Sequence, residues 1–293
     1  MIGFTSLRRL LLATAVLGFA AHAAAESPLT LEVYNPGTSA IFPVSSVLVS
    51  GSKEAVLVDA QFGKSQAEQL VEKIRASGKQ LTTIYISHGD PDYYFGLDTL
   101  TRAFPKAKVL ASAPTVEHIK ATVDGKLAFW GPKMGSDIPA KTIVPEVLKG
   151  HRLMLEGREL EVIGLDGPQP DRSFVWIPSL KAVVGGVVVA QNIHVWMADT
   201  QSAKSHQDWL ATLQRIQALQ PKVLVPGHYL GDGPHSVAAA QFTADYIKAF
   251  DEETAKAKDS AQLIAAMKQR YPNLGEESSL ELSAKVAKGE MKW

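Results

Sequence analysis

The chain has 293 residues, no cysteine, and equal numbers of basic and acidic side chains, 30 of each. Neither sign of charge forms a long run, so the sequence offers no basic surface for nucleic acid or for an anionic membrane. Without cysteine the chain can form neither disulfides nor a lipid-modified cysteine. We therefore expect a small-molecule substrate and no nucleic-acid partner, and composition predicts no particular oligomeric state.

The first 25 residues have the pattern of a secretory signal peptide. A basic pair at 8–9 precedes an apolar run over 10–20, and small residues follow at Ala23 and Ala25. The apolar run is shorter than the roughly 20 residues that span a bilayer, and no later segment approaches that length. We therefore expect a periplasmic or secreted protein without a stable membrane anchor.

Cleavage after Ala25 would leave residues 26–293 as the mature chain, long enough for one large α/β domain. Mass spectrometry of the exported fraction is expected to give the mass of a chain that begins at Glu26. A full-length chain that begins at Met1 in that fraction would contradict the prediction.

In chain order, the first half of the mature chain predicts strands and then alternating strands and helices. Apolar, β-rich runs predict strands, and one polar segment with an apolar stripe predicts a helix that ends near Gly78. The expected strands lie at 29–34, 45–51, 54–60, 82–87 and 108–112, and the expected helix lies at 64–78.

The second half predicts a group of short strands followed by helices. The expected strands lie at 151–155, 159–165, 173–178, 181–189 and 222–228, with a long helix at 205–220 and two further helical stretches after the last strand. Two sheet-rich halves, each with helices, predict sheets inside and helices outside. The alternative is a doubly wound parallel sheet, which the four closely spaced strands of the second half disfavour.

Four segments resemble the metallo-β-lactamase superfamily. They are the strand and turn at 56–63, the loop "ISHGDPDYYFG" at 86–96, the strands at 173–186, and "QPKVLVPGH" at 220–228. The resemblance extends over nearly all of the mature chain. It implies a metallo-β-lactamase-like domain over 26–293, an αββα four-layer sandwich with its site at one edge of the two sheets.

The loop at 86–96 departs from the metal-binding loop of that family. His88 stands at the position of the family's first histidine and Asp92 at the position of its aspartate. Asp90 stands where the second histidine belongs, and Tyr93 stands where the third belongs. Two of the four family positions in this loop are therefore changed.

Outside that loop, the family's last histidine is present as His228, whereas two other positions differ. The segment 164–173 should hold a histidine and has none, so Asp166 or Asp171 is the nearest ionisable candidate. Gly186 stands where the family has its metal-bridging aspartate. The resemblance therefore implies a site unlike that of an ordinary two-zinc hydrolase.

The remaining donors imply one divalent metal ion. Two imidazoles and two carboxylates, from His88, Asp90, Asp92 and His228, with Asp166 as a further candidate, suit zinc, manganese or iron. A metal would activate water, and Asp92 or a neighbouring carboxylate would take the proton. The expected function is hydrolysis of a small ester, lactone, amide or phosphate-containing substrate.

Other interpretations of the same residues stay open. Asp90 and Asp92 also suit the first turn of a helix that begins at Pro91, without any metal. Tyr93 is a candidate hydrogen-bond donor to a substrate oxyanion, or only a pocket wall. The whole chain could also be a non-catalytic descendant of the fold that binds a small molecule in the same cleft.

Two further residues are candidates for substrate contact. His194 and Trp196 follow the expected strand at 181–189 and would suit the rim of a pocket. A lone histidine can equally be structural. The aromatic segment "FWGPKM" at 129–134 is a candidate flap over the site, although buried packing also explains it.

Overall fold

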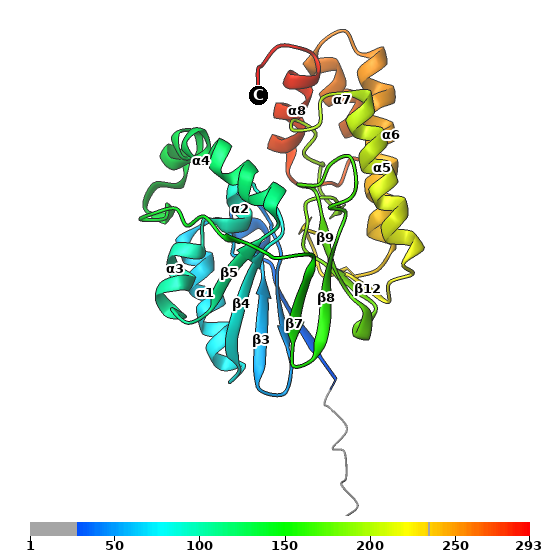
Figure 1. Cartoon of the computed structure of the whole chain (residues 1–293). Coiled ribbons are helices and arrows are strands. Elements are labelled where there is room, and N and C mark those ends of the chain that lie inside the picture. Colours follow the sequence, from blue (N-terminus) through cyan, green and yellow to red (C-terminus); the bar gives the residue numbers. More distant parts are fainter. Residues whose placement is uncertain (1–27, 234) are drawn as a thin grey trace, which may run out of the picture.

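The computed structural model describes residues 28–233 and 235–293, so the expected signal peptide lies outside the described residues. Two β-sheets pack face to face, and helices cover both outer faces (Figure 1). This arrangement is the αββα sandwich predicted from the sequence. No helix within the described ranges is both long and apolar enough to cross a membrane.

The first sheet contains six strands in the same order as the chain. Its first two pairings are antiparallel and its last three are parallel. The strands are β1 (Thr30–Tyr34), β2 (Ser46–Ser50), β3 (Glu54–Val58), β4 (Gln80–Ile86), β5 (Lys108–Ala111) and β6 (Glu146–Val147). The helices that accompany this sheet are α1 (Lys64–Ala76), α2 (Pro91–Tyr94), α3 (Leu97–Ala103) and α4 (Ala113–Met134).

The second sheet has the order β12-β10-β9-β8-β7. Its strands are β7 (Arg152–Leu155), β8 (Arg158–Ile163), β9 (Phe174–Ile177), β10 (Ala182–Val184) and β12 (Val223–Leu224). A separate parallel pair joins β11 (Ala190–Gln191) to β13 (His228–Tyr229). Short 3-10 helices lie at Gly37–Ser39, Gly135–Asp137 and Pro178–Leu180.

The helices of the second half are α5 (Ala203–Ala218), α6 (Ala238–Lys256), α7 (Ser260–Arg270) and α8 (Glu277–Ala287). Three helices therefore follow β12, where the sequence pattern indicated two. The extra boundary arises at Asp259, whose side chain accepts a hydrogen bond from the Gln262 N–H at 2.8 Å and so starts a new helix.

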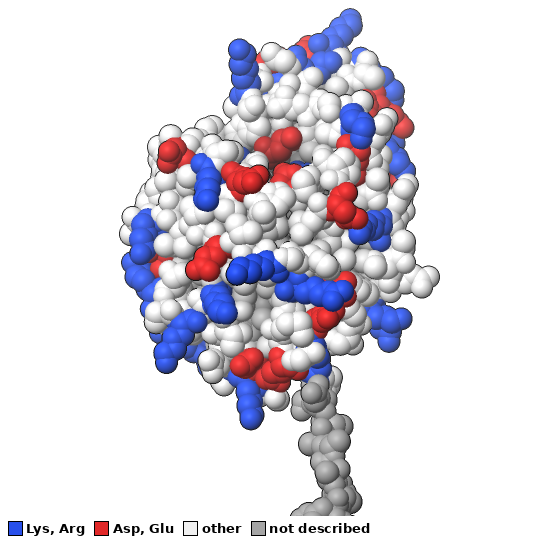
Figure 2. Space-filling view, viewed as in Figure 1, with Lys and Arg blue, Asp and Glu red and all other residues white. Residues whose placement is uncertain are grey.

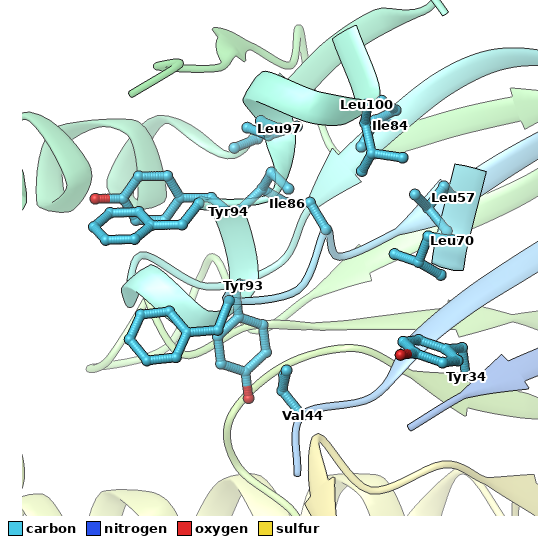
Figure 3. Close-up of a cluster of buried hydrophobic side chains, with 14 of the residues drawn as sticks. Tyr34, Val44, Leu57, Leu70, Ile84, Ile86, Tyr93, Tyr94, Leu97 and Leu100 are labelled. Atoms are coloured by element: carbon cyan, nitrogen blue, oxygen red, sulfur yellow. The ribbon is translucent and has the colours of Figure 1, made fainter. Parts of the chain in front are cut away.

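Strand β3 shows why both faces of the first sheet are buried. Val56 and Val58 point into the core between the two sheets, whereas Leu57 packs with Leu70 on the helix side (Figure 3). A strand covered on both faces reads as a continuous apolar run, which is what 55–58 shows. The residues expected to be buried are all at most 1% exposed: Val56, Leu57, Val58, Ile84, Ile86, Val183, Val184, Leu224 and Val225.

The 91–96 segment is fixed to the end of β3 by a close backbone contact. The Ala60 N–H donates to the Tyr93 carbonyl at 2.8 Å, and the Gly96 N–H donates to the Gln61 carbonyl at 2.9 Å. A Cβ atom on Gly96 would lie 1.9 Å from the Ala60 carbonyl oxygen. Only glycine therefore allows this approach.

Substitution of Gly96 by alanine is expected to lower the free energy of unfolding by about 2 to 3 kcal/mol, because a backbone segment must move to make room. The matched control is Gly125→Ala in α4, where a Cβ atom would meet nothing within 4 Å. That substitution should stabilise the protein by up to about 1 kcal/mol. Urea unfolding of both variants checks the prediction, and equal effects at the two glycines would contradict it.

Candidate functional site

A cleft lies where the loop after β4 meets the N-terminal end of β13, and its empty volume, counted together with the open solvent at its mouth, is about 640 Å³. Its lining comes from α2, α4, the segment 187–199, Glu276 and Trp293, so both halves of the chain contribute. Figure 2 shows several Asp and Glu side chains gathered on the face between α4 and the C-terminal helices. The cleft is thus partly acidic, although aromatic rings form much of its wall.

The first of two histidine–aspartate pairs is His88 with Asp90. The His88 Nε2 atom lies 3.0 Å from Asp90 Oδ2, and its Nδ1 atom lies 3.1 Å from the Asp171 carbonyl oxygen. Both ring nitrogens of this buried histidine are therefore engaged. Because a backbone carbonyl only accepts, Nδ1 carries a hydrogen and donates to Asp171.

The second pair is His228 with Asp92. The His228 Nε2 atom lies 2.6 Å from Asp92 Oδ2, and its Nδ1 atom lies 3.2 Å from the Tyr93 hydroxyl. The Tyr93 ring lies between the two histidines, with centroid distances of 5.2 Å to His88 and 5.5 Å to His228. One phenol thus connects the two pairs.

Tyr93 is fully buried and does not line the cleft. Burial and the nearby negative charge of Asp92 raise the pKa of its phenol well above the usual value, so it stays protonated. The expected role of Tyr93 as a donor to substrate has no support in this position. The Tyr93 hydroxyl instead contacts His228 Nδ1 and so helps to fix the orientation of that imidazole.

Asp90 occupies the N-cap position of α2, but its side chain makes no capping hydrogen bond. Its carboxylate instead contacts Lys126 of α4, whose Nζ atom lies 3.1 Å from Oδ1, and His118 Nε2 lies 3.9 Å away. Burial by itself raises the pKa of the Asp90 carboxyl, yet His88, His118 and Lys126 together hold that pKa well below its usual range. Asp90 is thus an ionised carboxylate that contacts Lys126 and the His88 imidazole, and the simple capped-turn interpretation is insufficient.

Lys126 remains charged inside the cleft. Burial opposes its charge, but the carboxylates of Asp90 and Asp199 outweigh burial and raise its pKa. Its Nζ atom also lies 5.0 Å from the centroid of the Trp293 ring. Lys126 therefore provides a fixed cation that lines the same cleft as Asp92.

A buried network supports the loop from below. The Ser87 N–H and hydroxyl donate to the two oxygens of Asp59 at 2.8 and 2.7 Å, and the Gly186 N–H donates to Ser87 Oγ at 2.7 Å. Asp59 adopts a left-handed backbone conformation with φ 66°, which aspartate tolerates better than most residues. The network joins the ends of β3, β4 and β10 beneath His88.

Asp59 makes stability depend on pH. Burial raises its pKa to about 7 despite the hydrogen bonds from Ser87. The folded state therefore holds a proton that the unfolded state releases near pH 4. The stabilisation is complete below about pH 4, decreases as pH rises, and is lost once pH has risen through about 7. Between pH 5 and pH 8 the parent should lose roughly 2 to 3 kcal/mol more stability than Asp59→Asn. Urea unfolding at both pH values checks this, and parallel losses in the two proteins would contradict it.

Two predicted site residues outside the loop lie in the cleft wall. His194 is 1% exposed, its Nδ1 atom lies 3.0 Å from the Tyr246 hydroxyl, and burial lowers its pKa to about 4. Trp196 packs edge-to-face against Phe42 and Trp293, with centroid distances of 5.9 and 5.2 Å. Both residues line the cleft, as expected of substrate-contacting residues, while substrate contact itself stays a prediction.

Asp166 lies outside the cleft. It is exposed on the surface, where its Oδ1 atom lies 2.7 Å from Arg215 Nη1 of α5. Asp171 contacts His88 through its backbone carbonyl. Asp166, predicted as a further metal ligand, is therefore placed outside the cleft and paired with Arg215 rather than with the other predicted ligands.

Sequence reasoning missed the cationic residues beside the site. Lys126 and His118 come from α4, whose polar residues carry no local motif, and Arg172 directly follows the candidate Asp171. No signal in the sequence pointed to Lys126. Trp130 of the aromatic segment 129–134 does line the cleft, while Phe129 packs against Trp293.

The fold and these positions agree with comparisons to known proteins. The sequence model of the metallo-beta-lactamase superfamily matches residues 40–228, which is more than half of the chain. This protein belongs to the metallo-β-lactamase superfamily. It is a divergent member of that superfamily, since its identity to the superfamily structures below is low.

Two curated proteins have partial sequence similarity. An uncharacterized protein, YobT from Bacillus subtilis, is 37% identical over 73 residues, which cover 25% of this chain and 31% of that protein. An atrochrysone carboxyl ACP thioesterase from Aspergillus fumigatus is 22% identical over 195 residues, which cover 66% of this chain and 53% of that protein. The chain thus spans about half or less of these relatives.

Solved structures share the fold. A metallo-β-lactamase family protein from Thermus thermophilus has a TM-score of 0.61 at 17% identity, covering 89% of this chain and 94% of its own. A metallo-β-lactamase from Pontibacter korlensis has a TM-score of 0.52 at 20% identity, covering 76% and 95%. At such identities the likeness concerns the fold alone.

Members of the superfamily usually bind divalent metals, but the residues present here do not fit such a site. Across the described ranges, no group of three or more His, Asp or Glu side chains is arranged to hold an ion. A side chain at Gly186, the position of the bridging aspartate, is excluded as well, since its Cβ would lie 2.4 Å from the Ser173 carbonyl oxygen at φ 80°. The expected single-metal set of His88, Asp90, Asp92 and His228 is instead divided into two hydrogen-bonded pairs.

Proposed function

We propose that this protein is a hydrolase that cleaves a small carboxylic-acid derivative, such as an ester, lactone, thioester or amide, in the cleft. The pair formed by Asp92 and His228 would activate water, and Lys126 would stabilise the developing oxyanion. We also propose that the protein works in the periplasm or outside the cell after removal of residues 1–25.

The observation that carries the proposal is the state of Asp92. One carboxylate oxygen contacts His228 at 2.6 Å, whereas the other has no hydrogen-bond partner among the described residues. Asp92 lines the cleft, and Tyr93 fixes the far side of the imidazole. A carboxylate held in this way has one oxygen available to accept a proton from water.

We infer the reaction from the groups that line the cleft. Asp92 Oδ1 takes a proton from water as the water oxygen bonds to the carbonyl carbon. The carbonyl oxygen becomes an anion, and the ammonium of Lys126 stabilises it. When the bond to the leaving group breaks, that group takes the proton from Asp92, so the products are an acid and an alcohol, thiol or amine. The protein groups used in these steps, Asp92, His228 and Lys126, all line the cleft.

Two observations support the acyl substrate. Five aromatic residues of the lining provide an apolar surface for a substrate body: Phe42, Trp130, Trp196, Trp209 and Trp293. One relative, over half its own length, is described as an acyl carrier protein thioesterase. A thioester is a carboxylic-acid derivative of the proposed class.

A panel of small substrates tests the function. It should contain aryl and alkyl esters, γ-lactones, acyl thioesters, anilides and phosphate monoesters, assayed with the purified mature chain. We expect turnover of at least one carbonyl class and a loss of that turnover in Asp92→Asn. Turnover of phosphate esters alone would overturn the acyl assignment.

A second candidate is ligand binding without turnover. It is favoured by the engagement of all four ring nitrogens of His88 and His228. Under this alternative, compounds of the panel stabilise the protein against heat without being consumed. Measuring melting temperature and product release on the same samples separates the two candidates.

A further inference from the structure

Arg172 is a buried cation whose side chain has no hydrogen-bond acceptor among the described residues. It is 6% exposed, lies just before β9, and its Nε atom has no hydrogen-bond partner in the part of the chain that the structure describes. None of the hydrogen bonds or ion pairs formed among the described residues involves its terminal guanidinium nitrogens either. The guanidinium carbon lies 4.4 Å from the centroid of the Trp209 ring, and the carboxylates of Asp199, Asp171 and Asp90 are within electrostatic range.

Such a residue is unusual on energetic grounds. Removing a charged group from water costs several kcal/mol unless a partner replaces the lost hydration, and arginine has five N–H donors to satisfy. Stacking on tryptophan recovers only part of this cost. The guanidinium therefore lacks a partner that a ligand anion would supply.

Arg172 is not itself part of the cleft lining, but the residue on which it stacks is, so the guanidinium lies beside the cleft. Trp209 lines the cleft, and its indole is fixed by a 2.8 Å hydrogen bond from Nε1 to the Val188 carbonyl. Asp199, also in the lining, is within electrostatic range of both Arg172 and Lys126. However, the Trp293 indole N–H already donates to Asp199 at 2.6 Å, and no salt bridge joins Asp199 to Arg172 within the described ranges.

The backbone around Arg172 is held in place without the guanidinium. Its N–H donates to the Gln169 carbonyl at 3.0 Å, and the Gln169 amide donates to the Ser205 carbonyl of α5 at 3.3 Å. The neighbouring Asp171 carbonyl contacts His88. The loop is thus connected to both α5 and the 86–96 loop, and the unused donors of Arg172 are not needed to hold it.

We propose that Arg172 is the recognition residue for an anionic oxygen group, a carboxylate or a phosphate, carried by the compound that occupies the cleft. The planar fork of the guanidinium matches both groups. The substrate would then have an apolar body against the aromatic wall, a carbonyl group near Asp92, and an anionic group at Arg172. This inference rests on the proposed function only in taking the same cleft as the binding site.

A binding experiment on the parent protein tests the proposal without any mutation. The probes are 4-phenylbutyrate, phenylphosphonate and the neutral 4-phenylbutan-1-ol, none of which contains an ester, thioester, amide or phosphate-ester bond that a hydrolase could cleave. Titration calorimetry should show that at least one anion binds about tenfold or more tightly than the alcohol. Preference for the carboxylate or for the phosphonate, which stands for a phosphate, identifies the group. Equal binding of all three would overturn the proposal.

Variants assign the preference to Arg172. Arg172→Met should abolish the preference for the anion and leave binding of the alcohol within about twofold, because the apolar stem is kept. Arg172→Lys should keep only part of the preference, since a point charge replaces the fork. The control is Arg215→Met, which removes an exposed arginine paired with Asp166. A preference retained in Arg172→Met would contradict the proposal.

Thermal stability separates recognition from a structural role. Without ligand, Arg172→Met should melt at or above the temperature of the parent, because it removes an unpaired buried charge. A structural guanidinium would instead make the variant less stable, which would count against the proposal. Because the probes are not substrates, the binding results test the Arg172 proposal even if no hydrolysis is found. Hydrolysis of neutral esters alone would refute the anionic subsite and leave the proposed hydrolase function intact.

Discussion

Replacement of Asp92 by asparagine is expected to lower kcat/KM for the acyl substrate by about 100-fold or more, the usual contribution of a general base. Asparagine has nearly the same shape, but it cannot take the proton from water. The 2.6 Å contact with His228 leaves one oxygen of the parent carboxylate available in the cleft. Steady-state kinetics on the best substrate of the panel measures the effect.

The control for this variant is Asp166→Asn, which changes an exposed carboxylate that is paired with Arg215 outside the cleft. It should retain nearly full activity. Circular dichroism and melting temperature verify that both variants are folded. Equal activities of Asp92→Asn and the parent would rule out Asp92 as the base.

Replacement of Lys126 by methionine should lower kcat by about 100- to 1,000-fold while KM changes little, because a group that stabilises the oxyanion acts mainly in the transition state. The substitution also leaves Asp90 without the cation that lies 3.1 Å from its carboxylate, so some loss of stability is expected. Activity is therefore compared at a temperature where the variant is fully folded.

Lys120→Met is the matched control, because Lys120 lies on the same helix and is exposed. It should behave like the parent in both kcat and melting temperature. If Lys126→Met raised KM and left kcat unchanged, Lys126 would be a residue for ground-state binding, and the oxyanion role would be wrong.

Most of the fold was predictable because both faces of its central strands are covered. The apolar run at 55–58 divides its side chains between two cores, and such runs identify central strands directly. The close group of strands at 151–184 was also readable from its turns. The number of C-terminal helices was less readable, since the boundary at Asp259 depends on one capping hydrogen bond.

The candidate site was predictable only where the chain itself brings residues together. His88, Asp90 and Asp92 share one loop, and the resemblance to the superfamily placed His228 beside them, which the 2.6 Å contact with Asp92 confirms. Their pairing was not predictable. Nor was the contact between Asp90 and Lys126, which comes from a helix that begins more than 20 residues later in the chain.

The cleft wall and Arg172 depend on tertiary contacts for the same reason. Trp293, Trp196 and Phe42 are far apart in the sequence, and only the folded chain stacks them edge-to-face. The unpaired state of Arg172 is a property of its surroundings after folding. The presence of an arginine in a sequence does not reveal whether hydrogen-bond acceptors will surround it in the folded protein.

The central claim is that the cleft hydrolyses an acyl substrate through Asp92, His228 and Lys126, without a preformed metal site. The most direct measurement is the rate of acid release from the best substrate by protein treated with a chelator and exchanged into metal-free buffer. The account predicts a rate close to that of untreated protein and a loss of this rate in Asp92→Asn. A rate that disappears with the chelator and returns in proportion to added Zn²⁺ or Mn²⁺ would contradict it.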